Sequence, residues 1–268
     1  MEGSGMKPLD DAYANAAHIP GAEDYPPRWA EQATEFRKGL EEEGRARLGL
    51  SYGESPRQVL DLFLPEAAPK GLCVFVHGGY WLRFDRSFWS HFAAGPLARG
   101  WAVAMPSYDL CPDVTIAQIT GQIAKAVTFA ATQVDGPIAL TGHSAGGHLV
   151  SRMAVPGVLP DGLAARLSSV VPISPVADLR PLLETSMNDQ LGMDIATAEA
   201  ESPVLMTPMD VPVNIWVGGK ERPVFLDQAK WLSEAWNAPL HIDPETHHFD
   251  VIDALKDPES AMVRRICG

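Results

Sequence analysis

The chain has 268 residues, of which 46% are hydrophobic and 21% are charged, and its formal net charge is −13. This composition provides enough apolar material for a core, and the acidic balance argues against nucleic-acid binding, which needs clustered Lys and Arg. No apolar run approaches the roughly 20 residues that cross a bilayer, and no basic segment followed by an apolar run opens the chain. We therefore expect one cytoplasmic domain, residues 1–268, that binds neither nucleic acid nor membrane.

The first fifty residues form an N-terminal arm whose pattern differs from the rest. A Pro-rich stretch covers residues 20–27, and a helix is predicted at residues 29–47 because apolar side chains recur there at helical spacing. These side chains are Trp29, Ala33, Phe36 and Leu40. The arm either seals the core with its apolar face or forms a partial lid over a functional pocket.

From residue 58 onward, short apolar runs alternate with helical stretches. Strands are predicted at residues 58–63, 72–77, 102–107, 138–141, 170–173, 211–217 and 240–242. Helices are predicted at residues 87–99, 116–133, 146–154 and 224–237, with a last helical run at 251–255. Most of the strands are nearly continuously apolar, as is typical of a parallel sheet covered by helices on both faces. The alternation predicts an α/β fold with a mostly parallel central sheet.

A serine flanked by glycines lies between the strand at 138–141 and the helix at 146–154. The segment reads Gly142-His143-Ser144-Ala145-Gly146. In a nucleophile elbow of the α/β-hydrolase fold, small flanking residues allow a tight strand-to-helix turn that holds the serine in a strained conformation. We predict that Ser144 is a catalytic nucleophile, and the alternative is a Gly-rich turn with an inert serine.

A pair of glycines directly follows the apolar strand at 72–77. The segment reads His77-Gly78-Gly79-Tyr80-Trp81. Because glycines let backbone N–H groups approach a substrate oxygen, we expect an oxyanion hole formed by Gly79 and Gly78 with the N–H of Ala145. His77 is expected to orient this loop through a backbone hydrogen bond.

Three further side chains are candidates for substrate binding. They are Tyr80 and Trp81 in the oxyanion loop and His143 before the nucleophile. Two aromatic rings beside the oxyanion hole would form a wall that favours planar aromatic substrates, and the alternative is simple packing of two large side chains.

The general base must come late in the chain, because this fold has the order Ser, acid, His. His241 lies inside the last predicted strand, whereas His247 and His248 follow it on a loop, where a catalytic histidine belongs. The spacing leaves His247 and His248 as alternatives.

The acid is expected after the next-to-last strand, where Glu221 is the only carboxylate close to the strand end. A glutamate can hold an imidazole in the right tautomer and stabilise the imidazolium as an aspartate does. Asp178, which follows the preceding strand, is the competing acid. A surface Glu221 paired with Lys220 or Arg222 is the third alternative.

Nothing in the spacing of His, Cys and carboxylates predicts a metal site, and the chemistry requires no cofactor. The three cysteines, Cys73, Cys111 and Cys267, suit neither a disulfide framework nor a CxxC site. The expected partner is a small-molecule substrate, and a homodimer is left open.

These motifs resemble the kynurenine formamidase (arylformamidase) branch of the α/β-hydrolases. Hormone-sensitive-lipase-like esterases usually carry a third glycine where this chain has Tyr80. The similarity extends to three further segments, Ser174-Pro175 with Asp178-Leu179, Glu201-Ser202-Pro203 and His248-Phe249-Asp250. The last segment carries the catalytic histidine in this family, so the resemblance implies His248 rather than His247. Glu221 stands where Asp is common.

The resemblance implies a serine hydrolase that forms an acyl-enzyme. Two substrate classes stay open, a small amide such as N-formylkynurenine and a short-acyl carboxylic ester. A non-catalytic ligand-binding homologue is the alternative from another class, and the complete set of nucleophile, base and acid disfavours it.

Overall fold

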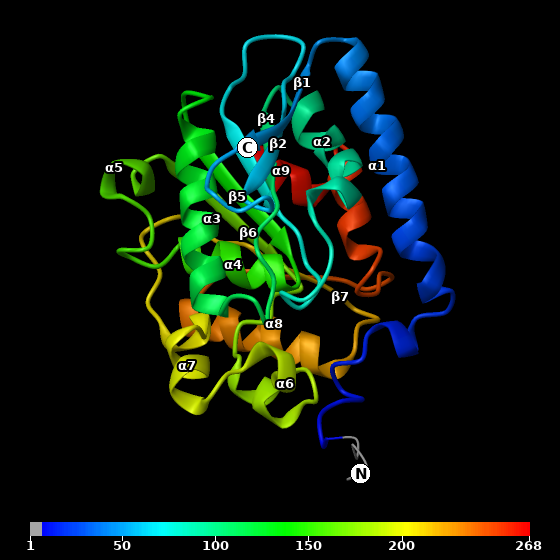
Figure 1. The fold of residues 1–268 in the computed structure, drawn as a ribbon, viewed down its shortest axis with the longest axis vertical. Helices are drawn as coiled ribbons and strands as arrows, with labels where there is room; N and C mark the ends of the chain where they lie inside the picture. Colours follow the sequence, from blue (N-terminus) through cyan, green and yellow to red (C-terminus); the bar gives the residue numbers. More distant parts are fainter. Residues whose placement is uncertain (1–6) are drawn as a thin grey trace.

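The computed structural model describes residues 7–268 and is built on an eight-stranded sheet of order β1-β2-β4-β3-β5-β6-β7-β8 (Figure 1). The strands are β1 (Ala46–Ser51), β2 (Val59–Phe63), β3 (Leu72–Val76), β4 (Ala102–Pro106), β5 (Ile138–His143), β6 (Leu167–Ile173), β7 (Ile215–Gly218) and β8 (Leu240–Asp243). β4, β3 and β5 to β8 pair in parallel, whereas β2 is antiparallel to both β1 and β4. The predicted α/β-hydrolase fold with a mostly parallel sheet is confirmed.

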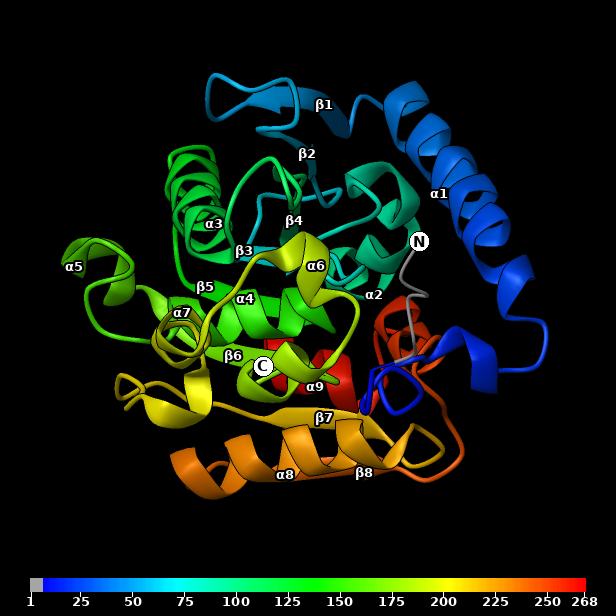
Figure 2. The same ribbon diagram turned by 60° about the horizontal axis from the view of Figure 1, so that its bottom comes forward.

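The helices are α1 (Tyr25–Glu42), α2 (Ala94–Ala98), α3 (Ile116–Ala131), α4 (Ala145–Met153), α5 (Asp161–Ala164), α6 (Asn188–Leu191), α7 (Ile195–Ala200), α8 (Pro223–Trp236) and α9 (Ala261–Cys267). α3, α4 and α8 cover one face of the sheet, and α1, α2 and α9 cover the other (Figures 1 and 2). α6 and α7 lie in the connection from β6 to β7, and α6 lies beside the start of the described chain, where Lys7 pairs with Asp189 (Figure 1).

The central strands are buried on both faces and supply two separate cores. In β3, Leu72, Val74 and Val76 pack into one core. Cys73 and Phe75 pack into the other. Successive side chains of a strand point to opposite faces, so a strand covered by helices on both sides has no position that favours a polar residue. This is why β3 is apolar throughout.

The arm differs from its prediction. The helix predicted at 29–47 ends at Glu42, and residues 46–51 form the edge strand β1 instead. The helix ends because Gly44 adopts a left-handed φ of 70° and the N–H of Arg45 bonds back to the carbonyl of Leu40. Half-buried and exposed residues alternate along β1, as is typical of an edge strand, but the helix predicted at 29–47 runs into its first two residues. The first six residues of the expected arm, 1–6, lie outside the described residues.

Other elements differ in length or type. The helix predicted at 87–99 is two 3₁₀ turns, Arg86–Phe88 and Ser90–Ala93, followed by the short α2, and the run at 251–255 is the 3₁₀ helix Val251–Lys256. The strand predicted at 211–217 begins only at Ile215. Over residues 7–268, no helix combines the length and apolar character needed to cross a bilayer.

Candidate active site

Ser144 occupies a sharp turn between β5 and α4. Its φ of 57° and ψ of −115° are strained for a residue with a side chain, and its N–H donates to the carbonyl of Ile173 in β6 at 2.9 Å. The flanking glycines are required by close packing. A Cβ on Gly142 would overlap the carbonyl oxygen of Gly146, and a Cβ on Gly146 would overlap that of Val76. The elbow geometry expected from the sequence is therefore present.

The loop after β3 lies directly against this turn. A Cβ on Gly78 would lie 2.8 Å from the carbonyl oxygen of His143 and 3.0 Å from Cβ of Ser144. Gly79 has a φ of 111°, and a Cβ there would lie 2.6 Å from the carbonyl oxygen of Arg83. Ala145 is the first residue of α4, where helical N–H groups have no partner within the helix. Gly78 and Ala145, two of the three groups expected to form an oxyanion hole, are thus close to Ser144, and Gly79 follows Gly78 in the same loop.

His248 and Glu221 form a buried pair. Nδ1 of His248 lies 2.6 Å from Oε2 of Glu221, and the residues are 3% and 7% exposed. The other carboxylate oxygen, Oε1, accepts the N–H of Gly218 at 2.8 Å and the hydroxyl of Ser174. Because Nδ1 is engaged by the carboxylate, Nε2 is the ring nitrogen available for proton transfer.

The rings of His143 and Phe225 both pack against the ring of His248. The ring centroid of His248 is 4.6 Å from that of His143 and 4.3 Å from that of Phe225. Burial, together with the neighbouring His248, holds the pKa of His143 well below its ordinary value, so this imidazole is neutral. His143 directly precedes Ser144, so the contact brings the base to the nucleophile elbow.

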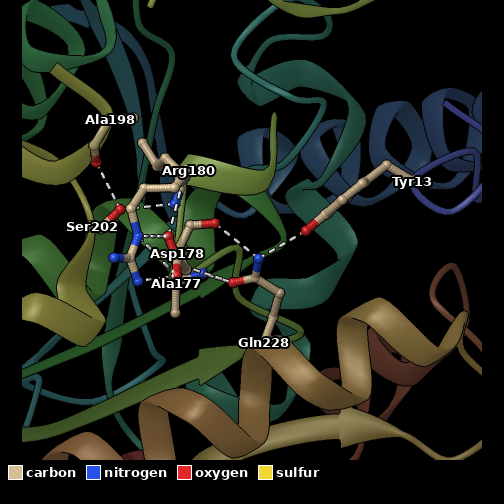
Figure 3. A network of polar contacts seen from close by, with 8 residues as sticks. Tyr13, Ala177, Asp178, Arg180, Ala198, Ser202 and Gln228 are labelled. Atoms are coloured by element: carbon tan, nitrogen blue, oxygen red, sulfur yellow. Dashed lines mark hydrogen bonds and ion pairs between the residues drawn. The ribbon is translucent and has the colours of Figure 1, made fainter. Parts of the chain in front are cut away.

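The competing acid and base have other partners. The carboxylate of Asp178 forms a two-point contact with the guanidinium of Arg180, at 2.7 Å and 3.0 Å (Figure 3). Nε2 of His247 lies 3.1 Å from the hydroxyl of Tyr25, and its Nδ1 lies 3.1 Å from Asp250. Neither residue contacts Glu221 or His248 in the hydrogen bonds formed among residues 7–268.

The expected aromatic wall is not formed as predicted. Trp81 is completely buried, and its ring packs edge-on against His148 at 5.1 Å, so it offers no surface to a substrate. Tyr80 is half-buried, and its hydroxyl donates to the carbonyl of Tyr13 at 2.7 Å. The two residues follow the same glycine pair with similar positive φ values, 54° and 58°, but their rings contact different parts of the chain.

Residues 7–25, which we term the N-terminal strap, cross the loops that carry these groups. Figure 2 shows its dark-blue ribbon between α1 and the orange-to-red segment after β8. The strap contacts the oxyanion loop at Tyr80, and it contacts the residues next to Glu221 and His248 in two other loops. The contacts are Tyr13 with Tyr80, Asp11 with Arg222 at 2.7 Å, and Tyr25 with His247. The sequence did not predict them.

A buried glutamine ties the strap to the loop after β6 (Figure 3). Gln228 is fully buried, and its Oε1 accepts the N–H groups of Ala177 and Asp178, both at 2.7 Å. Its Nε2 donates to the carbonyl of Asp178 at 2.8 Å and to the hydroxyl of Tyr13 at 2.9 Å. A single Gln on an amphipathic helix does not indicate in the sequence that its side chain joins two distant segments.

His77 is stacked on Tyr108, with ring centroids 4.3 Å apart, and Nδ1 lies 2.8 Å from the carbonyl of Gly78. Burial lowers the pKa of His77 to about 4, so the ring is neutral. This contact with the oxyanion loop agrees with the structural role expected for it. Within residues 7–268, no cluster of three or more His, Cys, Asp and Glu residues is placed to hold a metal ion.

The chain is similar to known proteins in both sequence and structure. Residues 60–236 match the BD-FAE family model. Kynurenine formamidase of Drosophila melanogaster is 32% identical, over 85% of this chain and 83% of the relative, and that of Salmo salar is 27% identical, over 84% and 81%. A crystal structure from Silicibacter sp. tm1040, provisionally named a thioesterase, is 62% identical with a TM-score of 0.96, over 98% of this chain and all of that one. Esterase B of Lactobacillus rhamnosis shares the fold at 21% identity, with a TM-score of 0.64 over 87% and 90% of the two chains. The chain therefore belongs to the BD-FAE family of α/β-hydrolases, in the branch of the kynurenine formamidases and related esterases.

Proposed function

We propose that this protein is a serine hydrolase that cleaves a small amide, of the aryl formamide type, through an acyl-enzyme on Ser144. The relatives and structural neighbours support a hydrolase of the ester or amide type. The observation that carries the serine mechanism is the buried contact of His248 with Glu221, on a ring that also packs against the residue before Ser144.

Acylation follows from this arrangement. Glu221 accepts the Nδ1 proton of His248 and so keeps Nε2 as a proton acceptor. His248 removes the hydroxyl proton of Ser144 while Oγ attacks the carbonyl carbon, and the oxygen that becomes negative faces the backbone N–H groups of the oxyanion hole. The protonated His248 then gives its proton to the leaving amine as the C–N bond breaks. The acyl group remains on Oγ.

Deacylation repeats these steps with water. His248 takes a proton from the water as its oxygen attacks the acyl carbon, and then returns that proton to Oγ of Ser144 as the acyl–oxygen bond breaks. The products are a carboxylic acid and the free enzyme. The oxyanion hole acts in both halves, and losing one of its donors typically lowers kcat by about 10²- to 10³-fold.

The leaving group distinguishes the substrate classes. An amide releases an amine, an ester releases an alcohol and a thioester releases a thiol, and the same three catalytic groups serve all of them. The amide class is supported by two formamidase relatives that match more than four-fifths of this chain. The ester class is the second candidate, because a structural neighbour with the same fold is an esterase.

The test is a comparison of kcat/KM on N-formylkynurenine, p-nitrophenyl acetate and a short-acyl thioester, for the wild type and Ser144→Ala. We expect the formamide to be the best substrate by at least about 10-fold, and Ser144→Ala to lose about 10⁴-fold or more on every substrate. Efficient ester turnover without formamide turnover contradicts the amide proposal. Activity retained by Ser144→Ala contradicts the nucleophile, and binding without turnover by the wild type supports a ligand-binding homologue.

A further inference from the structure

Ser174 lies at the end of β6 in a conformation that serine rarely adopts. Its φ is 47°, in the left-handed region, and the residue is completely buried. Its N–H donates to the carbonyl of Trp216 in β7 at 2.7 Å. The neighbouring strand therefore fixes the backbone of Ser174, and a strained residue held in this way points to a role for its side chain.

That side chain contacts the carboxylate of Glu221. An ionised carboxylate only accepts hydrogen bonds, so the hydroxyl of Ser174 donates to Oε1. The N–H of Gly218 donates to the same oxygen at 2.8 Å, while Oε2 faces Nδ1 of His248 at 2.6 Å. One oxygen is thus held by two donors, and the other is directed at the base.

A glutamate needs such a restraint more than an aspartate does. Its side chain has an additional rotatable bond, and each rotatable bond that is fixed costs conformational entropy. The broad torsion at the end of the chain lets the carboxylate plane turn unless donors fix it. With two donors on Oε1, the position of Oε2 is determined.

The same end of β6 also holds the nucleophile. The carbonyl of Ile173 accepts the N–H of Ser144 at 2.9 Å, and Ser174 is the next residue. Two consecutive residues therefore set the positions of the nucleophile and the acid relative to one strand. We infer that Ser174 is a positioning residue, which holds Glu221 so that Oε2 stays on His248. This inference rests on the proposed serine mechanism and adds a residue to it.

The test uses Ser174→Ala with Ser169→Ala as the matched control. Ser169 is also buried on β6, but its hydroxyl donates to the carbonyl of Ile266 at 2.7 Å, away from the site. We expect Ser174→Ala to lower kcat by about 10- to 100-fold, as for one hydrogen bond to a charged group, with KM changed less than about 3-fold. Ser169→Ala should lower the Tm without lowering kcat. A kcat of Ser174→Ala within about 2-fold of the wild type overturns the inference.

A double-mutant cycle separates positioning from a merely structural effect. In a Glu221→Gln background, Ser174→Ala should lower kcat by less than about 3-fold, because the restrained carboxylate is already gone. An undiminished loss in that background overturns the inference.

A measurement without substrate keeps the two proposals distinguishable. The proton of His248 Nδ1 gives a downfield NMR resonance that reports its bond to Glu221, and Ser174→Ala should shift or broaden it while Ser169→Ala leaves it in place. An unchanged resonance in Ser174→Ala overturns the positioning role. Activity retained by Ser144→Ala contradicts the proposed function instead. The NMR resonance of His248 does not depend on that activity, so the two proposals can fail separately.

Discussion

Glu221→Gln is the substitution whose effect the structure specifies most fully. The N–H of Gly218 can only donate, so the oxygen of the new amide must take the place of Oε1, and the NH₂ group must face His248. The hydroxyl of Ser174 can still donate to that oxygen. An NH₂ group opposite Nδ1 forces Nδ1 to accept, and the ring proton then moves to Nε2. His248 would face Ser144 with a proton and could not take one.

The size of the loss follows from this tautomer change. The variant retains the shape of the side chain and all but one of its hydrogen-bond directions, so binding and folding should change little. Catalysis loses its base, and an equivalent acid-to-amide change in a serine protease lowers kcat by about 10⁴-fold. We expect a loss of about 10³- to 10⁴-fold in kcat, with KM within about 3-fold.

The assay is steady-state kinetics on whichever substrate of the panel is turned over, with thermal denaturation to confirm folding. Asp178→Asn is the matched control, because it neutralises the competing acid and breaks its contact with Arg180. That control should keep kcat within about 3-fold. The reasoning is refuted if Glu221→Gln keeps more than a tenth of the wild-type kcat, or if Asp178→Asn shows the larger loss.

Gly78→Ala should lower kcat by about 10²-fold, because the new Cβ would lie 3.0 Å from Cβ of Ser144. Gly121→Ala in α3, where a Cβ has open space, should keep full activity, and equal kcat values for the two variants would contradict a catalytic role of the loop after β3. Burial lowers the pKa of His91 to about 4, so the unfolded chain binds the extra proton between pH 6.5 and 4 and stability falls as the pH drops through that window. His91→Leu should flatten the Tm–pH curve there, and an unchanged curve would contradict this assignment. We propose that the strap acts as a partial lid. Asp11→Arg would place a positive charge opposite Arg222 and loosen the strap, so it should raise kcat/KM for a bulky ester relative to p-nitrophenyl acetate. An unchanged ratio argues for a fixed strap.

The sequence predicted the parts of the site that depend on local geometry. The glycines around Ser144 are required by close contacts at one tight turn. Glu221 follows the end of β7, a strand that the sequence reveals as an apolar run. β1 escaped prediction because the predicted helix ran into its first two residues and because Gly49, with a positive φ, lies where the register of the strand shifts. Ser174 escaped because its role depends on a side chain 47 residues away. Patterns of 2 or 3.6 residues carry no information about such contacts.

The strap has a consequence for the order in which the protein is assembled. Tyr13 and its partner Gln228 are 215 residues apart, and Tyr25 and His247 are 222 residues apart. A ribosome therefore synthesises Tyr13 and Tyr25 more than 200 residues before these two partners. Until then the hydroxyl of the buried Tyr13 lacks its hydrogen-bond donor, Gln228. The strap thus completes these contacts only after residues 228 and 247 are in place, and a chain that ends before them would leave the strap without two of its contacts to the catalytic loops.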